Sequence, residues 1–105
     1  MLLATLRKLG FYCTFSMDAD RAIKTLSQEN FDLVISDYLL PGTNGVEIIR
    51  LMRKQGIDVP ALVITNYPSE LLNVSNKALG RTKIISKTSF NPDNMLKIVQ
   101  GMMNT

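Results

Sequence analysis

A short apolar run that ends near an aspartate constrains this chain more than any other feature. Residues 33–35 are Leu, Val and Ile with no polar alternation, and Asp37 follows two positions later. A run of this length that is rich in β-branched residues predicts a strand buried on both faces, as in parallel sheets. Such a strand carries Asp37 to its carboxyl end, where open α/β sheets bind their ligands.

The residues after Asp37 predict a tight turn that leads into a helix. Pro41 and Gly42 are typical turn residues, because proline fixes φ and glycine tolerates a positive φ. Asn44 and Gly45 then open a helical pattern. We therefore expect Pro41 and Gly45 to shape the loop beside the aspartate.

Helical and strand patterns alternate along the whole chain, with no linker, repeat or low-complexity segment. Strands are predicted over residues 11–15, 33–36, 61–65 and 83–86. Helices are predicted over residues 2–9, 44–54 and 68–79, after a cap at Asp18, and after a helix start at residues 91–93. This alternation indicates βαβ units and a parallel sheet covered by helices on both faces.

Two of these helices carry apolar stripes that predict their buried faces. The stripes are Val46, Ile48, Ile49 and Met52 in the third helix, and Met95, Leu96, Val99 and Met102 in the last.

Composition excludes several classes of function. The chain of 105 residues has the length of one small domain and contains no histidine, which excludes a His-based nucleophile and a His metal cluster. Its single cysteine, Cys13, cannot form an internal disulfide, as is typical of a reducing cytoplasm. The net charge of +3 includes no basic run, so binding of nucleic acid is weakly supported. The first residues are too short an apolar stretch for a signal sequence or a membrane span.

Three polar residues stand at the ends of the last three predicted strands: Asp37, Thr65 and Lys87. The carboxyl ends of parallel strands lie side by side, so a carboxylate, a hydroxyl and an ammonium should converge. A carboxylate can accept a phosphoryl group, and the cation and the hydroxyl can bind the added charge. The structural alternative is a half-exposed salt bridge between Asp37 and Lys87 beside an ordinary strand threonine.

With these residues the chain resembles the receiver domain of two-component response regulators and hybrid sensor kinases. The resemblance covers essentially all 105 residues, and its most specific part is the run S-D-x-x-x-P-G-x-N-G from Ser36 to Gly45, with Thr65 and Lys87 in register. It implies a flavodoxin-like (CheY-like) α/β fold, a doubly wound parallel sheet with strand order 2-1-3-4-5.

The resemblance also implies roles for single residues. Asp37 would be the phosphoacceptor, with a histidine kinase or a histidine phosphotransfer domain as donor. Thr65 would turn toward the phosphoryl group and Lys87 would bind it, while Mg²⁺ would be held partly by Asp37 and by the backbone carbonyl of Leu39. The resemblance implies a cytoplasmic phosphoacceptor domain that switches a protein-interaction face and is not an enzyme beyond self-catalysed phosphorylation and dephosphorylation. A homodimer is compatible with it, whereas nucleic acid and membrane are not expected as partners.

The largest departure from the family lies at the front of the chain. Receiver domains begin with a buried central strand followed by two acidic residues that hold Mg²⁺, whereas this sequence begins at the helix after them. We therefore expect one N-terminally truncated receiver-like domain over residues 1–105. A gap should separate residues 11–15 from the strand over 33–36, leaving ladder hydrogen bonds unmade. The missing first strand has three open explanations: a truncated gene product, a mis-set start, or a strand supplied by another chain.

The same departure weakens the predicted chemistry. Asp18 and Asp20 are better suited to capping and solvated roles than to replacing the acidic pair. Mg²⁺ prefers several oxygen ligands, so a site built on Asp37 should bind it weakly. Because phosphoryl transfer depends on Mg²⁺ to neutralise charge, we expect this chain to accept phosphate poorly.

Smaller departures surround the site. Thr88 follows Lys87 where the family has a proline with a cis bond, so either trans geometry or a strained loop is expected. Ile84 stands at the aromatic switch position of the family, which makes the usual rotamer switch doubtful. The flanking residues Leu39 and Tyr67 are bulky and uncharged, and they predict a long-lived phosphoryl group in an intact version of the domain.

Two further hypotheses compete with a phosphoacceptor. A pseudo-receiver would keep the fold and Asp37 but act as a protein-interaction module without phosphate. A flavin-binding flavodoxin-like domain needs a Ser/Thr/Gly-rich phosphate loop after its first strand, and the sequence contains no such loop.

Overall fold

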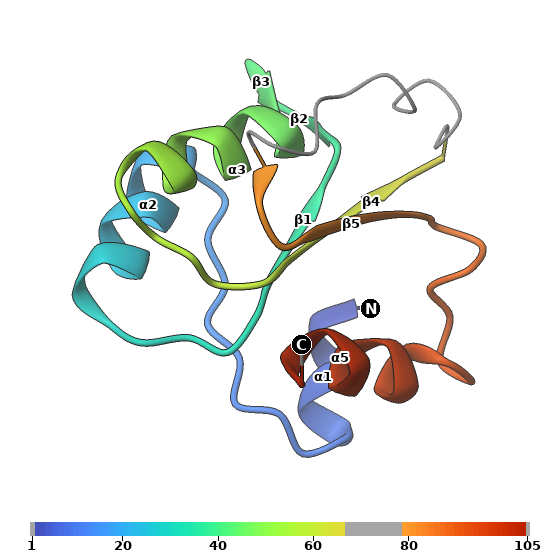
Figure 1. Cartoon of the computed structure of the whole chain (residues 1–105). Helices are drawn as coiled ribbons and strands as arrows, with labels where there is room; N and C mark the ends of the chain where they lie inside the picture. Colours follow the sequence, from blue (N-terminus) through green and yellow to red (C-terminus); the bar gives the residue numbers. More distant parts are fainter. Residues whose placement is uncertain (1, 67–78, 105) are drawn as a thin grey trace.

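The computed structural model describes residues 2–66 and 79–104 (Figure 1). The helices are α1 (Leu2–Lys8), α2 (Ala19–Gln28), α3 (Gly45–Lys54) and α5 (Met95–Met103). The strands are β1 (Val34–Asp37), β2 (Leu39–Leu40), β3 (Thr43–Asn44), β4 (Ala61–Thr65) and β5 (Thr82–Ser86). The predicted helix over residues 68–79 and the flanking residue Tyr67 lie outside the described residues, apart from the end of that helix at Leu79.

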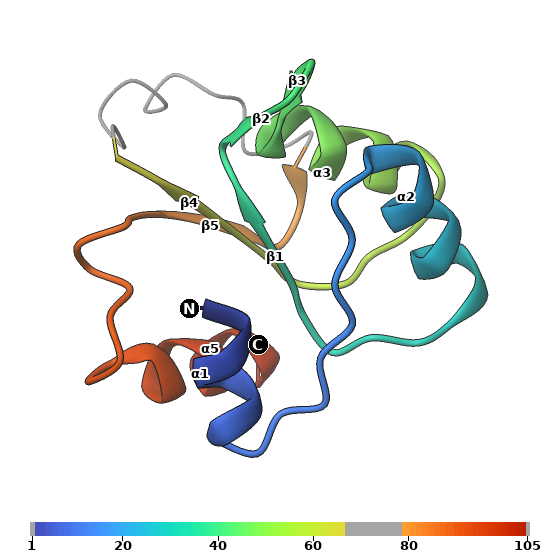
Figure 2. The same ribbon diagram turned by 180° about the vertical axis from the view of Figure 1, so that it is seen from behind.

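The sheet is parallel and lies between two layers of helices. Its strand order is β1-β4-β5, with Asp37 aligned to Ile64 and Thr65 aligned to Ser86. Helices α2 and α3 lie on one face and α1 and α5 on the other, as the two views of the ribbon show (Figures 1 and 2). The predicted doubly wound parallel α/β architecture is confirmed.

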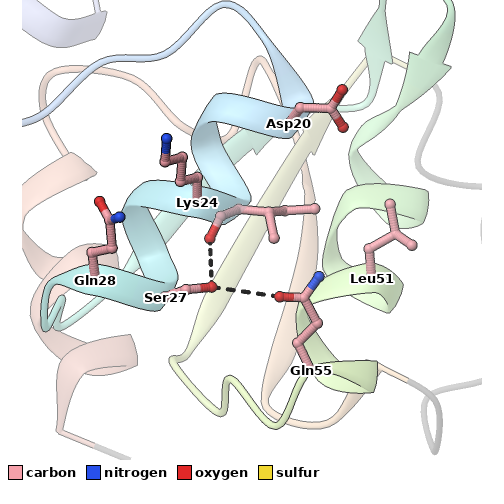
Figure 3. Close-up of a pocket in the computed structure, with 7 residues that line it drawn as sticks. Asp20, Lys24, Ser27, Gln28, Leu51 and Gln55 are labelled. Atoms are coloured by element: carbon pink, nitrogen blue, oxygen red, sulfur yellow. Dashed lines mark hydrogen bonds between the residues drawn. The ribbon is translucent and has the colours of Figure 1, made fainter.

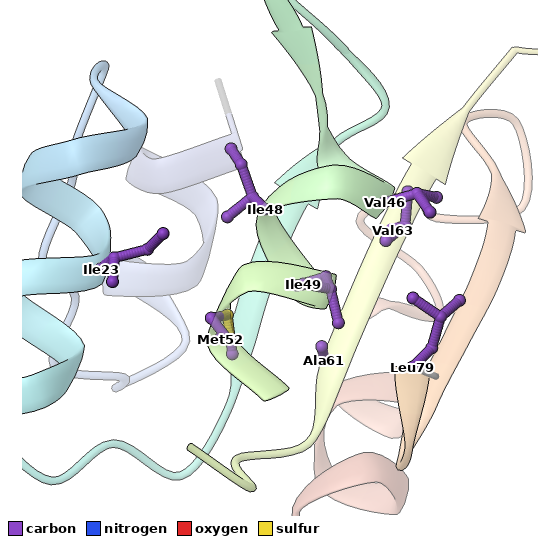
Figure 4. Close-up of a cluster of buried hydrophobic side chains, with 8 residues drawn as sticks. All are labelled: Ile23, Val46, Ile48, Ile49, Met52, Ala61, Val63 and Leu79. Atoms are coloured by element: carbon purple, nitrogen blue, oxygen red, sulfur yellow. The ribbon is translucent and has the colours of Figure 1, made fainter. Parts of the chain in front are cut away.

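An apolar cluster fills each of the two interfaces between helices and sheet. The cluster beneath α2 and α3 contains the whole predicted stripe of α3 (Figure 4); its buried members are Ile23, Val46, Ile48, Ile49, Met52, Ala61, Val63 and Leu79. The cluster beneath α1 and α5 consists of Leu6, Leu62, Ile64, Ile85, Phe90, Met95 and Val99. Alternate residues of β4 serve the two clusters, because successive side chains of a strand point to opposite faces.

Local sequence signals explain where α2 and α3 begin and end. The Asp18 carboxylate accepts a hydrogen bond from the Asp20 N–H at 2.9 Å, and the Asn44 side chain accepts one from the Glu47 N–H at 2.9 Å. Each pairs a backbone donor left free at a helix start, and the cap at Asp18 was predicted. Gly56 follows α3 with φ +78°, a conformation that favours glycine.

An arginine ties the end of α3 to the amino-terminal edge of the sheet, a feature that the sequence did not reveal. The Arg53 guanidinium donates to the carbonyls of Leu79 at 2.6 Å, Ile57 at 2.9 Å and Val59 at 2.7 Å. Partial burial lowers the pKa of Arg53, but a guanidinium remains charged in proteins. The charged donors thus satisfy loop carbonyls from three separate positions in the chain.

The predicted strand over residues 11–15 is wrong. Residues 11–16 form neither helix nor strand, and Tyr12 and Phe15 are 96% and 64% exposed. A strand exists only where its backbone pairs with a neighbour. No described strand pairs with this segment, so its β-branched and aromatic composition is not enough to make it one.

The prediction that β1 is buried on both faces is also wrong. Every residue of β4 is buried, whereas Val34, Ile35 and Ser36 are half-buried and Asp37 is exposed. The reason is position, since β4 lies between two strands while β1 has one neighbour among the described strands.

The last helix differs from its prediction in two respects. Helix α5 begins at Met95, because the Asn91 side chain accepts from the Asp93 N–H at 3.0 Å and closes a separate turn before the helix. Leu96 is 38% exposed and therefore lies outside the buried stripe. Met95 and Val99 are buried as predicted, and Met102 is half-buried.

Candidate functional site

The three polar residues predicted to converge lie at adjacent strand ends. Asp37 ends β1 and Thr65 ends β4, while Lys87 follows β5. The Tyr38 N–H donates to the Ile64 carbonyl at 2.8 Å, and the Lys87 N–H donates to the Thr65 carbonyl at 2.9 Å. These two hydrogen bonds extend the sheet by one residue on each side and hold the three backbones next to one another.

The side chains of the outer two residues form a loose ion pair. Lys87 Nζ lies 4.0 Å from Asp37 Oδ1, and each side chain is 51% exposed. An exposed pair at this separation contributes about 0–1 kcal/mol to stability. The Thr65 residue between them in the sheet is 4% exposed. The arrangement therefore leaves the carboxylate open to a reaction partner, with a cation beside it.

The loop after Asp37 folds back, so that the start of α3 lies against the end of β1. Strands β2 and β3 form an antiparallel hairpin whose turn is Pro41–Gly42, with Gly42 at φ +73°. The Gly45 N–H at the start of α3 then donates to the Tyr38 carbonyl at 2.8 Å. A Cβ at Gly45 would lie 2.5 Å from the Asp37 carbonyl oxygen, closer than real Cβ contacts. Only glycine fits at this position.

Three hydroxyl groups beside the site make contacts that the sequence did not predict. Ser36 Oγ donates to the Asp37 carbonyl at 2.9 Å, and the hydroxyls of Ser86 and Thr88 lie 2.8 Å apart. Their only sequence signal is a serine next to each strand end, which is common in loops. The Lys87–Thr88 peptide bond is trans, one of the two geometries expected, since the described part of the chain contains no cis bond.

The donor atoms near Asp37 fit a magnesium ion poorly. Among residues 2–66 and 79–104, no group of three His, Cys, Asp or Glu side chains gathers where it could hold a metal. Asp18 is engaged as the cap of α2, and Asp20 lies on α2 beside the groove of Figure 3. Asp37, with the carbonyl of Leu39 as a further predicted ligand, would supply two of the oxygen ligands of an octahedral Mg²⁺, so most of the others would have to be water.

A separate groove lies between α2 and α3 (Figure 3). It has a volume of about 440 Å³ and is lined by Asp20, Ile23, Lys24, Ser27, Gln28, Leu51 and Gln55. Ser27 Oγ donates to the Ile23 carbonyl at 2.9 Å and lies 3.4 Å from Gln55 Oε1. None of the predicted site residues lines this groove, so it is distinct from the strand-end site.

Comparison with known proteins identifies the family. The model of the response regulator receiver domain matches residues 1–100. The chain belongs to this family. As a receiver domain it has the fold of a two-component signalling module, a class that generally serves as a phosphoacceptor switch rather than a classical enzyme.

Individual relatives agree with this assignment. The receiver domain is 27% identical over 105 residues to the phosphate regulon transcriptional regulatory protein PhoB of Klebsiella pneumoniae. That match covers 98% of this chain and 45% of PhoB, so the chain spans less than half the length of that relative.

Solved structures show the same fold. Chemotaxis protein CheY4 of Vibrio cholerae is 30% identical with a TM-score of 0.83, and the match covers 97% of this chain and 86% of CheY4. The receiver domain of sensor histidine kinase PA1611 from Pseudomonas aeruginosa is 22% identical with a TM-score of 0.76, covering 99% and 86% of the two chains. That structure has a magnesium ion coordinated in its active-site cleft. Among the described helices of the present chain, none combines the length and the apolar character needed to cross a membrane.

Proposed function

We propose that this receiver domain accepts a phosphoryl group on Asp37 from the phosphohistidine of a histidine kinase or a histidine phosphotransfer domain. The observation that carries the proposal is the placement of an exposed carboxylate 4.0 Å from the Lys87 ammonium at the carboxyl edge of the sheet. In the transfer, an Asp37 oxygen bonds to phosphorus as the phosphorus–nitrogen bond of the donor breaks. The donor imidazole leaves and takes up a proton, and Asp37 becomes an acyl phosphate.

Lys87 and Thr65 are assigned the binding of the new group. The Lys87 ammonium already lies beside the carboxylate, so it is placed to pair with the added phosphate charge. Thr65 ends the neighbouring strand, and rotation of its side chain would let the hydroxyl donate to a phosphoryl oxygen. Because Thr65 is buried, such a rotation would disturb the packing at the end of β4 and so alter a protein-interaction face.

The small number of carboxylates near Asp37 determines the expected rate of phosphoryl transfer. Because no group of three metal-ligating side chains gathers among the described residues, little Mg²⁺ should be bound, and the charge that develops on the phosphoryl group is left to Lys87. We therefore expect slow transfer. Exposure to acetyl phosphate and Mg²⁺, followed by the intact mass over time, tests this: slow gain of one phosphoryl group is expected, and rapid stoichiometric labelling would contradict the incomplete metal site.

The second candidate is a pseudo-receiver that binds a protein partner without phosphate. The same lack of a carboxylate cluster among the described residues favours it. Tyr38, next to Asp37, offers a direct probe, since Mg²⁺ bound at the carboxylate should change tyrosine fluorescence. A fluorescence change that Asp37→Asn abolishes supports the phosphoacceptor. No change up to high Mg²⁺ concentration, together with no labelling by acetyl phosphate, supports the pseudo-receiver.

A further inference from the structure

The residues on either side of Lys87 carry hydroxyls that are hydrogen-bonded to each other. Ser86 Oγ and Thr88 Oγ1 lie 2.8 Å apart, and the Thr88 N–H donates to the same Ser86 oxygen at 3.2 Å. The bond from the Thr88 N–H closes a ring of atoms that contains the backbone of Lys87, so it restricts φ and ψ of that residue. The function proposed for Asp37 assigns no role to either hydroxyl.

Backbone hydrogen bonds hold both ends of this segment, which leads from β5 toward α5 (Figure 1). The Lys87 N–H donates to the Thr65 carbonyl at 2.9 Å, which ties it to the end of β4. The Ser86 carbonyl accepts from the Ser89 N–H at 3.0 Å and from the Phe90 N–H at 3.2 Å. Because the Phe90 side chain is buried in the cluster beneath α1 and α5, the segment is anchored to the sheet at one end and to the core at the other.

The turn before α5 supports the same segment. The Asn91 side chain donates to the Thr88 carbonyl at 3.2 Å, and the Asn91 N–H donates to the Asn94 side chain at 3.0 Å. These bonds hold the backbone of Thr88 in place. Its hydroxyl can therefore meet Ser86 Oγ without a further loss of backbone freedom.

The Lys87 ammonium depends on this backbone because its side chain is only loosely held. The side chain is 51% exposed and, among the described residues, forms a salt bridge with Asp37 alone. A lysine side chain has several rotatable bonds, and confining it to one geometry costs entropy. The direction in which the backbone of Lys87 points thus affects how often the ammonium lies near the carboxylate.

We propose that Ser86 and Thr88 are positioning residues for Lys87. Their hydroxyl pair fixes the backbone of the lysine and so keeps its ammonium beside the Asp37 carboxylate. Both residues act through Lys87 rather than on the phosphoryl group. The effect on phosphoryl transfer rests on the proposed function, whereas the effect on the distance between Lys87 and Asp37 does not.

Carbodiimide cross-linking of the full chain measures this geometry without phosphate. The reagent activates the Asp37 carboxyl, the neutral Lys87 amine attacks it to form an amide, and the displaced oxygen leaves with the reagent as a urea. Digestion and mass spectrometry then quantify the cross-link. Ser86→Ala removes both side-chain hydrogen bonds and should lower the yield about threefold. Thr88→Val keeps its N–H bond to Ser86 and should lower the yield by a smaller factor, which tests the pair independently of Ser86.

Conservative and neighbouring variants are the controls. Ser86→Thr and Thr88→Ser keep the hydroxyls and should give the yield of the unchanged chain. Ser89→Ala removes a nearby hydroxyl but keeps the backbone bonds of residue 89 to Ser86 and Asn94, so the yield should not change. Trapping of the activated Asp37 carboxyl by added glycine ethyl ester measures its reactivity, and each yield is divided by this value.

Labelling by acetyl phosphate separates a positioning role from a general structural one. Ser86→Ala should slow labelling about threefold in the unchanged chain but not in the Lys87→Ala background, because the lysine through which Ser86 acts is then absent. A general loss of structure would slow labelling in both backgrounds, and this result would overturn the proposal.

Cross-link yields decide the proposal even where labelling fails. Equal yields in the unchanged chain and in Ser86→Ala would overturn it, as would a yield that Ser86→Thr fails to restore. Cross-link yields that change as expected in a chain that acetyl phosphate does not label would support the positioning of Lys87 and contradict the proposed function alone.

Discussion

Replacing Gly45 by alanine should damage both the fold and the site, by an amount that the geometry allows us to estimate. The added Cβ would lie 2.5 Å from the Asp37 carbonyl oxygen and 2.9 Å from Ser36 Oγ, whereas ordinary contact begins at 3.4 Å. The nearer obstacle is backbone, so α3 must move away from the end of β1 by roughly 1 Å. Overpacking of this kind costs about 1–3 kcal/mol, and we expect Gly45→Ala to lower the free energy of unfolding by about 2 kcal/mol.

The matched control is Gly101→Ala. Gly101 lies within α5, and a Cβ there would meet nothing within 4 Å, so alanine should raise the free energy of unfolding by about 0.5–1 kcal/mol through its higher helix propensity. Urea denaturation followed by circular dichroism measures both variants against the unchanged chain. Equal stabilities of the two variants would refute the close approach of α3 to Asp37.

Three further predictions concern other parts of the structure. Arg53→Ala should lower the free energy of unfolding by about 2 kcal/mol in urea denaturation, because loop carbonyls lose a charged donor; a loss below about 0.5 kcal/mol would contradict this role. Lys87→Ala should reduce the initial rate of labelling by acetyl phosphate about tenfold while changing stability by less than about 1 kcal/mol, and an unchanged labelling rate would remove Lys87 from the site. In phosphorylated protein, Leu39→Asn combined with Tyr67→Glu should shorten the half-life of the phosphoryl group measured by mass spectrometry, because polar groups can position a hydrolytic water; an unchanged half-life would count against that reasoning.

Elements with strong local signals could be predicted from the sequence. The apolar stripe predicted for α3 is buried in the structure, and the helix begins at Gly45, close to the predicted start. Strand β4 was predicted with its observed bounds because a short β-branched run between proline and a polar residue has few other solutions. The start of α5 was misplaced because the Asn91 side chain closes a separate turn before the helix begins at Met95.

The features that failed depend on neighbours that no local pattern encodes. Residues 11–15 have the composition of a strand, but strand formation requires a paired backbone, and no described strand pairs with them. The burial of β1 was overestimated for the same reason, since an apolar run is buried on both faces only between two strands. Sequence composition thus indicated β1 and β4 as strands but did not show which segments find a neighbour to pair with.

More of the site than of the surrounding sheet could be predicted from the sequence. The rule that parallel strands end at one edge brought Asp37, Thr65 and Lys87 to adjacent positions, and the structure places them there. The contact of Ser36 Oγ with the Asp37 carbonyl could not be predicted, because it depends on the backbone path after β1.

Mapping the phosphorylated residue tests the central claim most directly. The chain is treated with acetyl phosphate and Mg²⁺, digested, and analysed by tandem mass spectrometry, in parallel with Asp37→Asn. The proposed function predicts a slowly accumulating phosphoryl group on Asp37 alone and no label in the Asp37→Asn variant. Label on another residue, equal labelling of the variant, or no label in either chain would contradict it.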